Sequence, residues 1–255
     1  MEPPTDRDGF ALVTGKRRAP KRPVAGHSGR RNESFADAAP LSRTGVVAAV
    51  RRQHRRLGDS QWWKTWAALL ASELQAAEKG RILCRGLGCV GRSDIAQMQC
   101  ALALLLQEAF GDATTRPEFC EPLISSVERE AVEELGFEVV DRISAPKNDG
   151  WELLYMPHCP AGLYHEELRL RWSVPALRRV RIIGNSFSNY FLRLAENKAP
   201  IIRLTEPFVR ETELPNASFA ADAFNDTSLL SFEPQENLEP LSKRHLEHND
   251  PEFRV

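Results

Sequence analysis

The sequence has no apolar run long enough to cross a lipid bilayer. Its longest run extends only from Ala101 to Leu106, whereas a membrane-spanning helix needs about 20 apolar residues. The opening stretch, MEPPTDRDGF, lacks the basic patch and the apolar segment of a signal peptide. The five cysteines are odd in number and have no disulfide-framework spacing, which is typical of reduced thiols. These absences predict an intracellular protein with no membrane partner, cytoplasmic, with the nucleus as a second compartment.

The net charge is small, −1, but it is unevenly distributed along the chain. Residues 1–60 carry 13 Lys and Arg against 6 Asp and Glu, whereas residues 205–255 carry 4 against 11. The N-terminal segment is also rich in Pro, Gly and Ser and shows no apolar period, which is typical of disorder. We therefore predict a disordered basic head at 1–41, one α/β domain at 42–232 and a flexible acidic tail at 233–255.

A basic cluster, KRRAPKRP at residues 16–23, lies in the predicted head. Such a cluster is either a nuclear-import signal or a solvated linker. Its prolines oppose a base-reading helix, and no aromatic residue is interleaved to stack on bases. We expect no direct binding to DNA.

Two amphipathic helices are predicted ahead of the first strand. From Ser42, valines recur on one side and arginines on the other, until Gly58-Asp59 breaks the pattern. Asp59 or Ser60 can cap a second helix from about Trp62 to Lys79. Its large apolar side chains recur at helical spacing, which indicates core packing rather than a ligand platform. They are Trp62, Trp66, Leu69, Leu70 and Leu74.

A short apolar strand, Ile82 to Cys84, runs into the glycine turn Gly86 to Gly91, and a long amphipathic helix begins at Ser93. Strand, glycine turn and helix form the context in which a Gly-x-Gly-x-x-Gly motif brings a phosphate to a helix N-terminus. Glu121, after the next strand, stands where dinucleotide folds place an acid on a ribose hydroxyl, but it comes 30 residues after the last glycine rather than about 20. The alternative is that the glycines only allow close packing of helix on sheet.

Short apolar strands alternate with helical patterns through the middle of the chain. Strands are predicted at 118–121, 137–140, 151–156 and 180–183, and helices at 127–135, at 163–172 and from about 187. Repeated β-α units predict a Rossmann-like, three-layer, mostly parallel α/β sheet. After Pro200 the pattern fades, and only an ordered loop at 223–228 is predicted there.

Several stretches resemble the Sensitivity-to-Red-Light-Reduced (SRR-like) family, in the same order and at matching intervals. They are Cys84–Gly88, Gln99–Leu102, Glu121-Pro122, Tyr155–Cys159, Leu163-Tyr164, Arg171-Trp172 and Ile182–Phe187, with Phe224–Ser228 similar to the animal branch. Together they span about residues 80–232. The chain departs from the family pattern at Arg85, where an aromatic residue is usual, and at Cys120-Glu121-Pro122, where Tyr-Asp-Pro is usual.

The resemblance implies a regulatory protein. The family is linked to red-light and circadian signalling in plants, and to haem biosynthesis and clock-gene expression in animals. No reaction is securely attached to it, so the resemblance implies regulation and supplies no mechanism. Recruitment of an unknown protein partner is one hypothesis for how such regulation would act.

Three loops that follow predicted strands would meet at the carboxyl edge of a parallel sheet, where ligands bind. They supply six candidate ligand-binding residues: Gly86, Gly88, His158, Cys159, Asn185 and Ser186. Cys159 or Ser186 as nucleophile with His158 as base would give a hydrolase or transferase. No carboxylate is evidently placed to orient His158, and adjacent residues on an extended chain point apart. We assign no catalytic residue.

The Cys159-Pro160 dipeptide offers a second hypothesis. Thiolate is a known axial ligand of haem iron, and the proline would hold the sulfur outward. Together with the haem link that the resemblance implies, this makes haem a candidate cofactor, with Cys159 as iron ligand and His158 or His165 as the second ligand. Zinc is less favoured, because the cysteines lack paired C-x-x-C spacing. A nucleotide ligand and a ligand-free protein-interaction module both remain open.

Overall fold

The computed structural model describes the chain in five segments, at residues 40–74, 80–146, 150–194, 199–215 and 218–242. The predicted disordered head, with its basic cluster, lies outside these residues apart from its last two positions. Residues 243–255 of the predicted tail also lie outside them.

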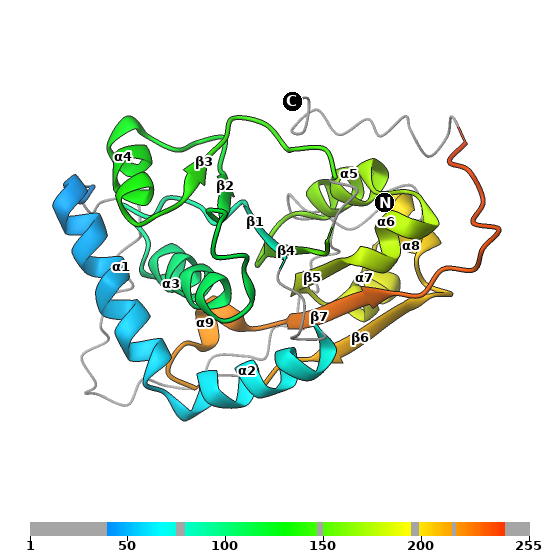
Figure 1. The fold of residues 1–255 in the computed structure, drawn as a ribbon, viewed down its shortest axis with the longest axis horizontal. Helices are drawn as coiled ribbons and strands as arrows, with labels where there is room; N and C mark the ends of the chain where they lie inside the picture. Colours follow the sequence, from blue (N-terminus) through cyan, green and yellow to red (C-terminus); the bar gives the residue numbers. More distant parts are fainter. Residues whose placement is uncertain (1–39, 75–79, 147–149, 195–198, 216–217, 243–255) are drawn as a thin grey trace, which may run out of the picture. The chain divides into compact units, whose positions relative to one another are not determined.

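A seven-stranded mixed sheet forms the centre of the fold (Figure 1). The strand order is β3-β2-β1-β4-β5-β7-β6, in which the first five strands of the chain run parallel and β7 is antiparallel to both of its neighbours. The predicted α/β class with a mostly parallel sheet is confirmed. The strands are β1 (Arg81–Arg85), β2 (Glu118–Cys120), β3 (Glu138–Val139), β4 (Glu152–Met156), β5 (Val180–Asn185), β6 (Val209–Glu213) and β7 (Thr227–Phe232).

Helices cover both faces of the sheet, so the fold has three layers with the sheet in the middle. One apolar cluster joins the sheet to α1 (Arg43–Gly58), α2 (Gln61–Glu73), α3 (Asp94–Phe110), α4 (Ser126–Glu134) and α9 (Ala221–Phe224). The other joins it to α5 (Ala161–Leu170), α6 (Val174–Arg179), α7 (Phe187–Arg193) and α8 (Pro200–Leu204). The three-layer arrangement therefore follows from two separate cores.

The alternation of side chains along each strand assigns residues to these two cores. On β4, Tyr155 packs in the core below α3, and its neighbour Leu154 packs in the core below α5. Ile183 and Ile182 divide in the same way on β5. Because successive side chains of a strand point to opposite faces, strands buried on both faces read as continuous apolar runs.

Serine is the N-cap residue of most of the long helices. Ser42, Ser60 and Ser93 each accept a hydrogen bond from a backbone N–H in the first turn of α1, α2 and α3. The predicted cap of the second helix is therefore Ser60. The structure describes that helix as Gln61–Glu73, and residues 75–79 of its predicted range lie outside the described segments. Trp66 and Leu70 are fully buried, which confirms that its aromatic face is core.

The region after Pro200 is more regular than predicted, because it contains α8, β6, α9 and β7. Polar residues dominate β6, an edge strand with the sequence VRETE, so its sequence has no apolar alternation to recognise. β7 lies between β5 and β6 and buries Leu229, Leu230 and Phe232. The described part of the predicted tail, 233–242, contacts the body: Trp172 Nε1 donates to Glu239 O at 2.9 Å.

Candidate functional site

The carboxyl edge of the sheet holds all of the candidate residues found from the sequence. The strand order reverses between β1 and β4, and the crevice at such a switch point is the usual ligand site of an open α/β sheet. The glycine turn follows β1, the turn with His158 and Cys159 follows β4, and Asn185 and Ser186 end β5. Direct hydrogen bonds join the three loops, so their predicted convergence is confirmed.

The glycine turn is held by carboxylates of the protein. Gly86 and Gly88 have φ of 60° and 77°, a backbone conformation that glycine adopts without strain. Gly88 N donates to Glu121 Oε2 at 2.9 Å, and Gly91 N donates to Glu128 Oε1 at 2.8 Å. A phosphate at this turn would need these N–H groups and would meet two negative charges there. In this conformation the turn does not fit a phosphate.

The thiol of Cys159 fills the crevice between β1 and β4. It is 2% exposed, and Sγ donates to Arg85 O at 3.1 Å. A Cβ on Gly86 would lie 2.9 Å from this sulfur, so the glycine is needed for the contact. Burial raises the pKa of the Cys159 thiol well above its ordinary value, which opposes the thiolate that binds haem iron. The surroundings of Cys159 do not fit a haem.

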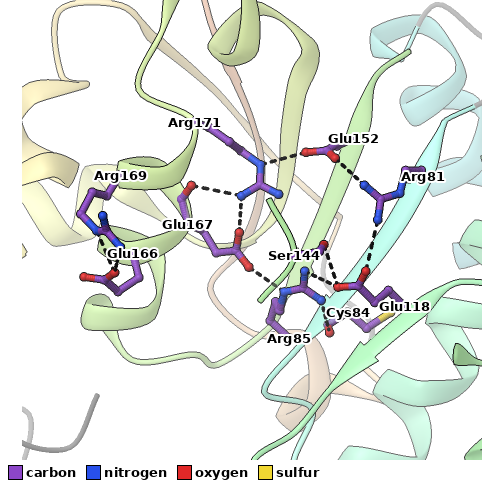
Figure 2. Close-up of polar contacts among 10 residues, drawn as sticks. All are labelled: Arg81, Cys84, Arg85, Glu118, Ser144, Glu152, Glu166, Glu167, Arg169 and Arg171. Carbon is purple, nitrogen blue, oxygen red and sulfur yellow. Dashed lines mark hydrogen bonds and ion pairs between the residues drawn. The ribbon is translucent and has the colours of Figure 1, made fainter. Parts of the chain in front are cut away.

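Six side chains of alternating charge form a closed ring of ion pairs (Figure 2). Each carboxylate contacts two guanidinium groups. The ring lies between β1, β2, β4 and the end of α5, and all of its side chains are buried except that of Arg81, which is 19% exposed. Its members, in order around the ring, are Arg81, Glu118, Arg85, Glu167, Arg171 and Glu152. The three positive and three negative charges cancel, which satisfies the requirement that buried charges be paired.

Arg85 links this ring to the edge of the sheet. Its guanidinium contacts Glu167 at 2.6 Å and Glu118 at 2.7 Å, and its carbonyl accepts the thiol of Cys159. Burial lowers the pKa of Arg85, but the two carboxylates outweigh it and the net pKa is raised. The ring therefore fixes the end of β1, from which the glycine turn starts.

His158 and Cys159 do not form a catalytic dyad. His158 is exposed and Cys159 is buried, so their side chains lie in different surroundings. The cause is a turn with a left-handed backbone at His158, not the extended chain that the sequence suggested. His158 has a φ of 55°, and its N–H donates to Asn185 Oδ1 at 2.8 Å. Its Nδ1 lies 3.4 Å from Nε2 of the buried Gln99. Among the described residues, the partner of His158 Nδ1 is therefore the amide of Gln99 and not a carboxylate.

The side chain of Asn185 connects the turn after β4 to the end of β5. Its Nδ2 donates to Cys159 O at 3.0 Å and to Tyr190 Oη at 2.8 Å, while Oδ1 accepts from His158 N. With its polar atoms occupied in this way, Asn185 holds the two turns together rather than facing a ligand.

Ser186 belongs to a pocket on the other side of β5, which we call the β5–β7 pocket. It has a volume of about 410 Å³ and lies where β5 and β6 end and β7 begins. Hydroxyl, amide and carboxylate groups dominate its lining, with an apolar wall of Phe224 and Leu214. The polar lining residues are Ser186, Ser188, Asn189, Glu211, Glu213, Asp226, Thr227 and Ser228.

Glu211 is the centre of the polar lining. Its Oε2 accepts from both N and Oγ of Ser188, at 2.8 and 2.7 Å, and its Oε1 accepts from Ser228 Oγ at 2.8 Å. Burial raises its pKa, but the hydrogen bonds, including one from Ser186, outweigh burial and hold the net pKa below the ordinary value. The pocket therefore keeps a negative charge at neutral pH.

Asp226, another lining residue, is held in a strained backbone conformation. Its φ is 55°, its carbonyl accepts from Ser186 N at 3.1 Å, and its carboxylate accepts from Asn189 Nδ2. Burial is the largest cause of its raised pKa, against which Asn189, Arg193 and His158 act. Non-glycine residues in this region cost of order 1–3 kcal/mol and gather at functional sites.

The lining suits binding better than catalysis. Ser186 is the N-cap of α7, where Oγ accepts from Asn189 N at 3.1 Å. Its acceptor Glu211 has a lowered pKa and is a weak base, whereas a general base works best with a pKa near the operating pH. Among the residues that the structure describes, no group of three or more His, Cys, Asp or Glu side chains is arranged to hold a metal ion.

None of the helices within the described segments combines the length and the apolar character needed to cross a bilayer.

Of the residues that line this pocket, Ser186 was predicted from the sequence as a ligand-binding residue and the others were not. Glu211 and Ser188 gave no signal, because β6 has no apolar period and Ser188 is one of many serines. Asp226 lies within the predicted ordered loop, so the family resemblance marked the region without assigning it a role. Buried Gln99 also lies in a stretch that carries the resemblance.

Comparison with known proteins identifies the family. The SRR1 domain model matches residues 55–231. The chain is 28% identical over 171 residues to Protein SENSITIVITY TO RED LIGHT REDUCED 1 of Arabidopsis thaliana, a match that covers 63% of this chain and 60% of that protein. It is 32% identical to a mouse SRR1-like protein (52% and 54% covered) and 30% identical to a Drosophila melanogaster SRR1-like protein (62% and 56% covered). The chain thus matches less than two thirds of the length of each relative.

Two solved structures show a weak similarity to this chain. A putative O-methyltransferase from Klebsiella pneumoniae superposes with a TM-score of 0.40 at 17% identity, covering 74% of this chain and 90% of that one. A protein of Thermoplasma acidophilum gives 0.34 at 12% identity, covering 72% and 95%. Neither likeness bears on the function. The domain match over residues 55–231 and the named relatives show that the chain belongs to the SRR1 domain family.

Proposed function

We propose that this chain is a regulatory protein whose β5–β7 pocket binds a small organic ligand with an ammonium or guanidinium group. The observation that carries the proposal is the meeting of three carboxylates with serine hydroxyls in one hollow of about 410 Å³. The carboxylates belong to Glu211, Glu213 and Asp226. Pockets of this volume hold small molecules, and a few placed polar groups give them specificity.

The division of roles within the pocket supports a cationic ligand. Serine donors already occupy the carboxylate of Glu211, which leaves Glu213 and Asp226 to meet the charge of a ligand. Charge-assisted hydrogen bonds from N–H donors to carboxylates are stronger than neutral ones. Phe224 and Leu214 offer a surface for a short carbon skeleton.

A regulatory role is favoured over an enzymatic one by two observations. The hydroxyl of Ser186 is bound to a carboxylate of lowered pKa, so the pocket lacks an activated nucleophile. One relative is named for reduced sensitivity to red light, which describes a response and not a reaction.

The SRR-like resemblance extends the proposal to regulation of haem biosynthesis and of circadian gene expression, through a protein partner. Because Cys159 does not suit haem iron, we propose that the protein influences haem synthesis without holding haem at this thiol. Haem content and clock-transcript rhythm in cells that carry only an Asp226→Asn allele test this: both should change as in a null allele. Normal values for both, with the protein at its usual level, would contradict it.

Thermal denaturation with a ligand panel tests the pocket. The panel holds agmatine and spermidine as cations, AMP and NAD as nucleotides, and haemin. A ligand at about 100 times its Kd adds about 2.7 kcal/mol to the free energy of unfolding, which raises Tm by roughly 5–10 °C in a domain of this size. We expect a rise with a cation and none with the nucleotides.

Two double variants show whether a ligand that raises Tm binds in the β5–β7 pocket. Glu213→Gln with Asp226→Asn should abolish it, whereas Glu130→Gln with Glu133→Gln on α4 removes the same charge elsewhere and should leave it intact. A rise with NAD or AMP, or a cation effect that both double variants lose equally, would overturn the proposal. No rise with any ligand would favour an interaction module without a small ligand.

A further inference from the structure

The solvent face of α1 carries a cluster of arginines. Arg51, Arg52, Arg55 and Arg56 are exposed, and the helix, RTGVVAAVRRQHRRLG, contains no acidic residue. At 100° per residue the four side chains project within one side of the last two turns. The opposite side of the helix is buried against α3 and α4, beside which α1 lies in Figure 1.

These arginines differ from the other basic residues of α1 in their partners. Arg43 contacts Glu134 at 2.6 Å, and His54 contacts Glu108 at 2.9 Å. Within the described segments, by contrast, no carboxylate lies within ion-pair distance of the four arginines. The guanidinium of Arg56 lies over the ring of Phe219, 5.1 Å from its centroid. The negative end of the helix dipole favours cations in the last turn only, so it leaves Arg51 and Arg52 unexplained.

A small hollow adjoins the arginines. It has a volume of about 210 Å³ and lies between α1, α3 and the end of α4. Leu104 and Leu135 supply apolar lining, and Arg51 and the His54–Glu108 pair complete it. The hollow can take one aliphatic side chain while groups on either side of it meet the arginines.

We propose that this face of α1 binds an acidic segment of a partner protein. One aliphatic side chain of the segment enters the hollow. The Asp and Glu carboxylates of the same segment bind Arg51, Arg52 and Arg55. All four cations are arginine and none is lysine, which suits the two-pronged recognition of carboxylates by planar guanidinium groups. The surface shares no residue with the β5–β7 pocket.

Two features favour an acidic peptide over nucleic acid. The side chain of Glu108, 61% exposed, lines the hollow. An acidic segment can place its uncharged aliphatic residue there, whereas a nucleic-acid backbone carries a phosphate at every nucleotide. Binding of single strands uses aromatic side chains on which bases stack, and the aromatic ring at this face, Phe219, is half-buried and covered by Arg56.

Fluorescence anisotropy with the full chain tests the proposal. The probe is a labelled 12-residue peptide of Asp and Glu around one central Leu, compared with the same peptide bearing Gly for Leu, and with labelled duplex DNA. The double variant Arg52→Glu with Arg55→Glu replaces two positive charges of this face by two negative charges. Arg116→Glu with Arg142→Glu is the matched control, because both residues are exposed and make no ion pair among the described segments.

The proposal predicts that the first double variant weakens binding of the Leu peptide by about tenfold or more, and that the control changes it less than about twofold. The Gly peptide should bind the wild type more weakly than the Leu peptide. Equal losses in the two variants would reveal non-specific attraction and overturn the proposal. It would also be overturned by equal affinity for the two peptides, by tighter binding of DNA, or by no measurable peptide binding.

Discussion

At the scale of residues, the six-membered charge ring accounts for a charged side chain at the buried position of Arg85. An aromatic residue would place no charge in this layer, whereas Arg85 contacts both Glu118 and Glu167. Removing one member of a buried pair is costly, because the remaining charge has neither water nor a counter-ion. The six residues should therefore tolerate single substitutions poorly.

Substitution of Glu167 by Gln tests the ring. The change leaves Arg85 and Arg171 without a shared carboxylate, and we expect it to lower the free energy of unfolding by about 3–5 kcal/mol. Glu166→Gln, on the same helix, removes a partly exposed pair with Arg169 that lies 2.9 Å apart, and should cost less than about 1 kcal/mol. Urea denaturation measures both, and equal effects would show that the ring is not a stabilising unit.

The sequence could predict the turns at this scale but not the ring. The glycine pattern predicted a turn after the first strand, and Gly86 and Gly88 have the positive φ that such a turn uses. Arg81 and Glu152 are separated by 71 residues, and Arg85 and Glu167 by 82. No local period relates residues so far apart, and a charge next to an apolar strand reads as an exposed end.

At the scale of elements, Glu128 joins α4 to the glycine turn. It completes the capping box of α4 with Ser125 and accepts from Gly91 N. Burial raises its pKa, but the hydrogen bonds from Ser125 and Gly91 outweigh it, so the net pKa lies below 4.5. A carboxyl whose folded pKa is depressed contributes stability above its unfolded pKa and loses it as pH falls through the folded pKa.

Glu128→Gln should therefore weaken the domain at pH 7 and reduce its sensitivity to acid. We expect a loss of about 1–2 kcal/mol at pH 7, shrinking as pH falls below about 4.5, because the wild type then loses the same charge. Thermal melts from pH 7 to pH 3 measure this, with exposed Glu133→Gln as the control. A difference that is constant over this pH range would contradict the assigned charge.

β7 contributes to both cores of the fold, but the sequence pattern did not predict it as a strand. Its buried side chains fill both cores between β5 and β6, yet it follows a segment without clear periodicity. A chain that ends after Ser242 should keep the cooperative unfolding of the full protein. A chain that ends after Asp226 loses Leu229, Leu230 and Phe232, at about 2–5 kcal/mol for each large side chain.

Circular dichroism melts of the two shortened chains decide the point. We expect a sharp transition for the chain that ends after Ser242 and none for the chain that ends after Asp226. A native-like melt without β7 would mean that the sheet is complete at β5.

At the scale of the whole molecule, the same edge of the sheet carries a closed crevice and an open pocket. The crevice between β1 and β4 is filled by Cys159, and the glycine turn is bound to Glu121 and Glu128. The alternation of strands and helices predicted this edge and its loops correctly. It could not predict which loop contacts leave space, because that depends on β6 and β7, whose side chains complete the β5–β7 pocket.

We propose that ligands of this protein bind in the β5–β7 pocket and not at the switch point. The most direct measurement is an NMR titration of backbone amides with agmatine. The account predicts that shifts gather at 186–189 and 225–228 and vanish in Glu213→Gln with Asp226→Asn. Shifts centred on the glycine turn and residues 157–160, with the pocket amides unmoved, would contradict it.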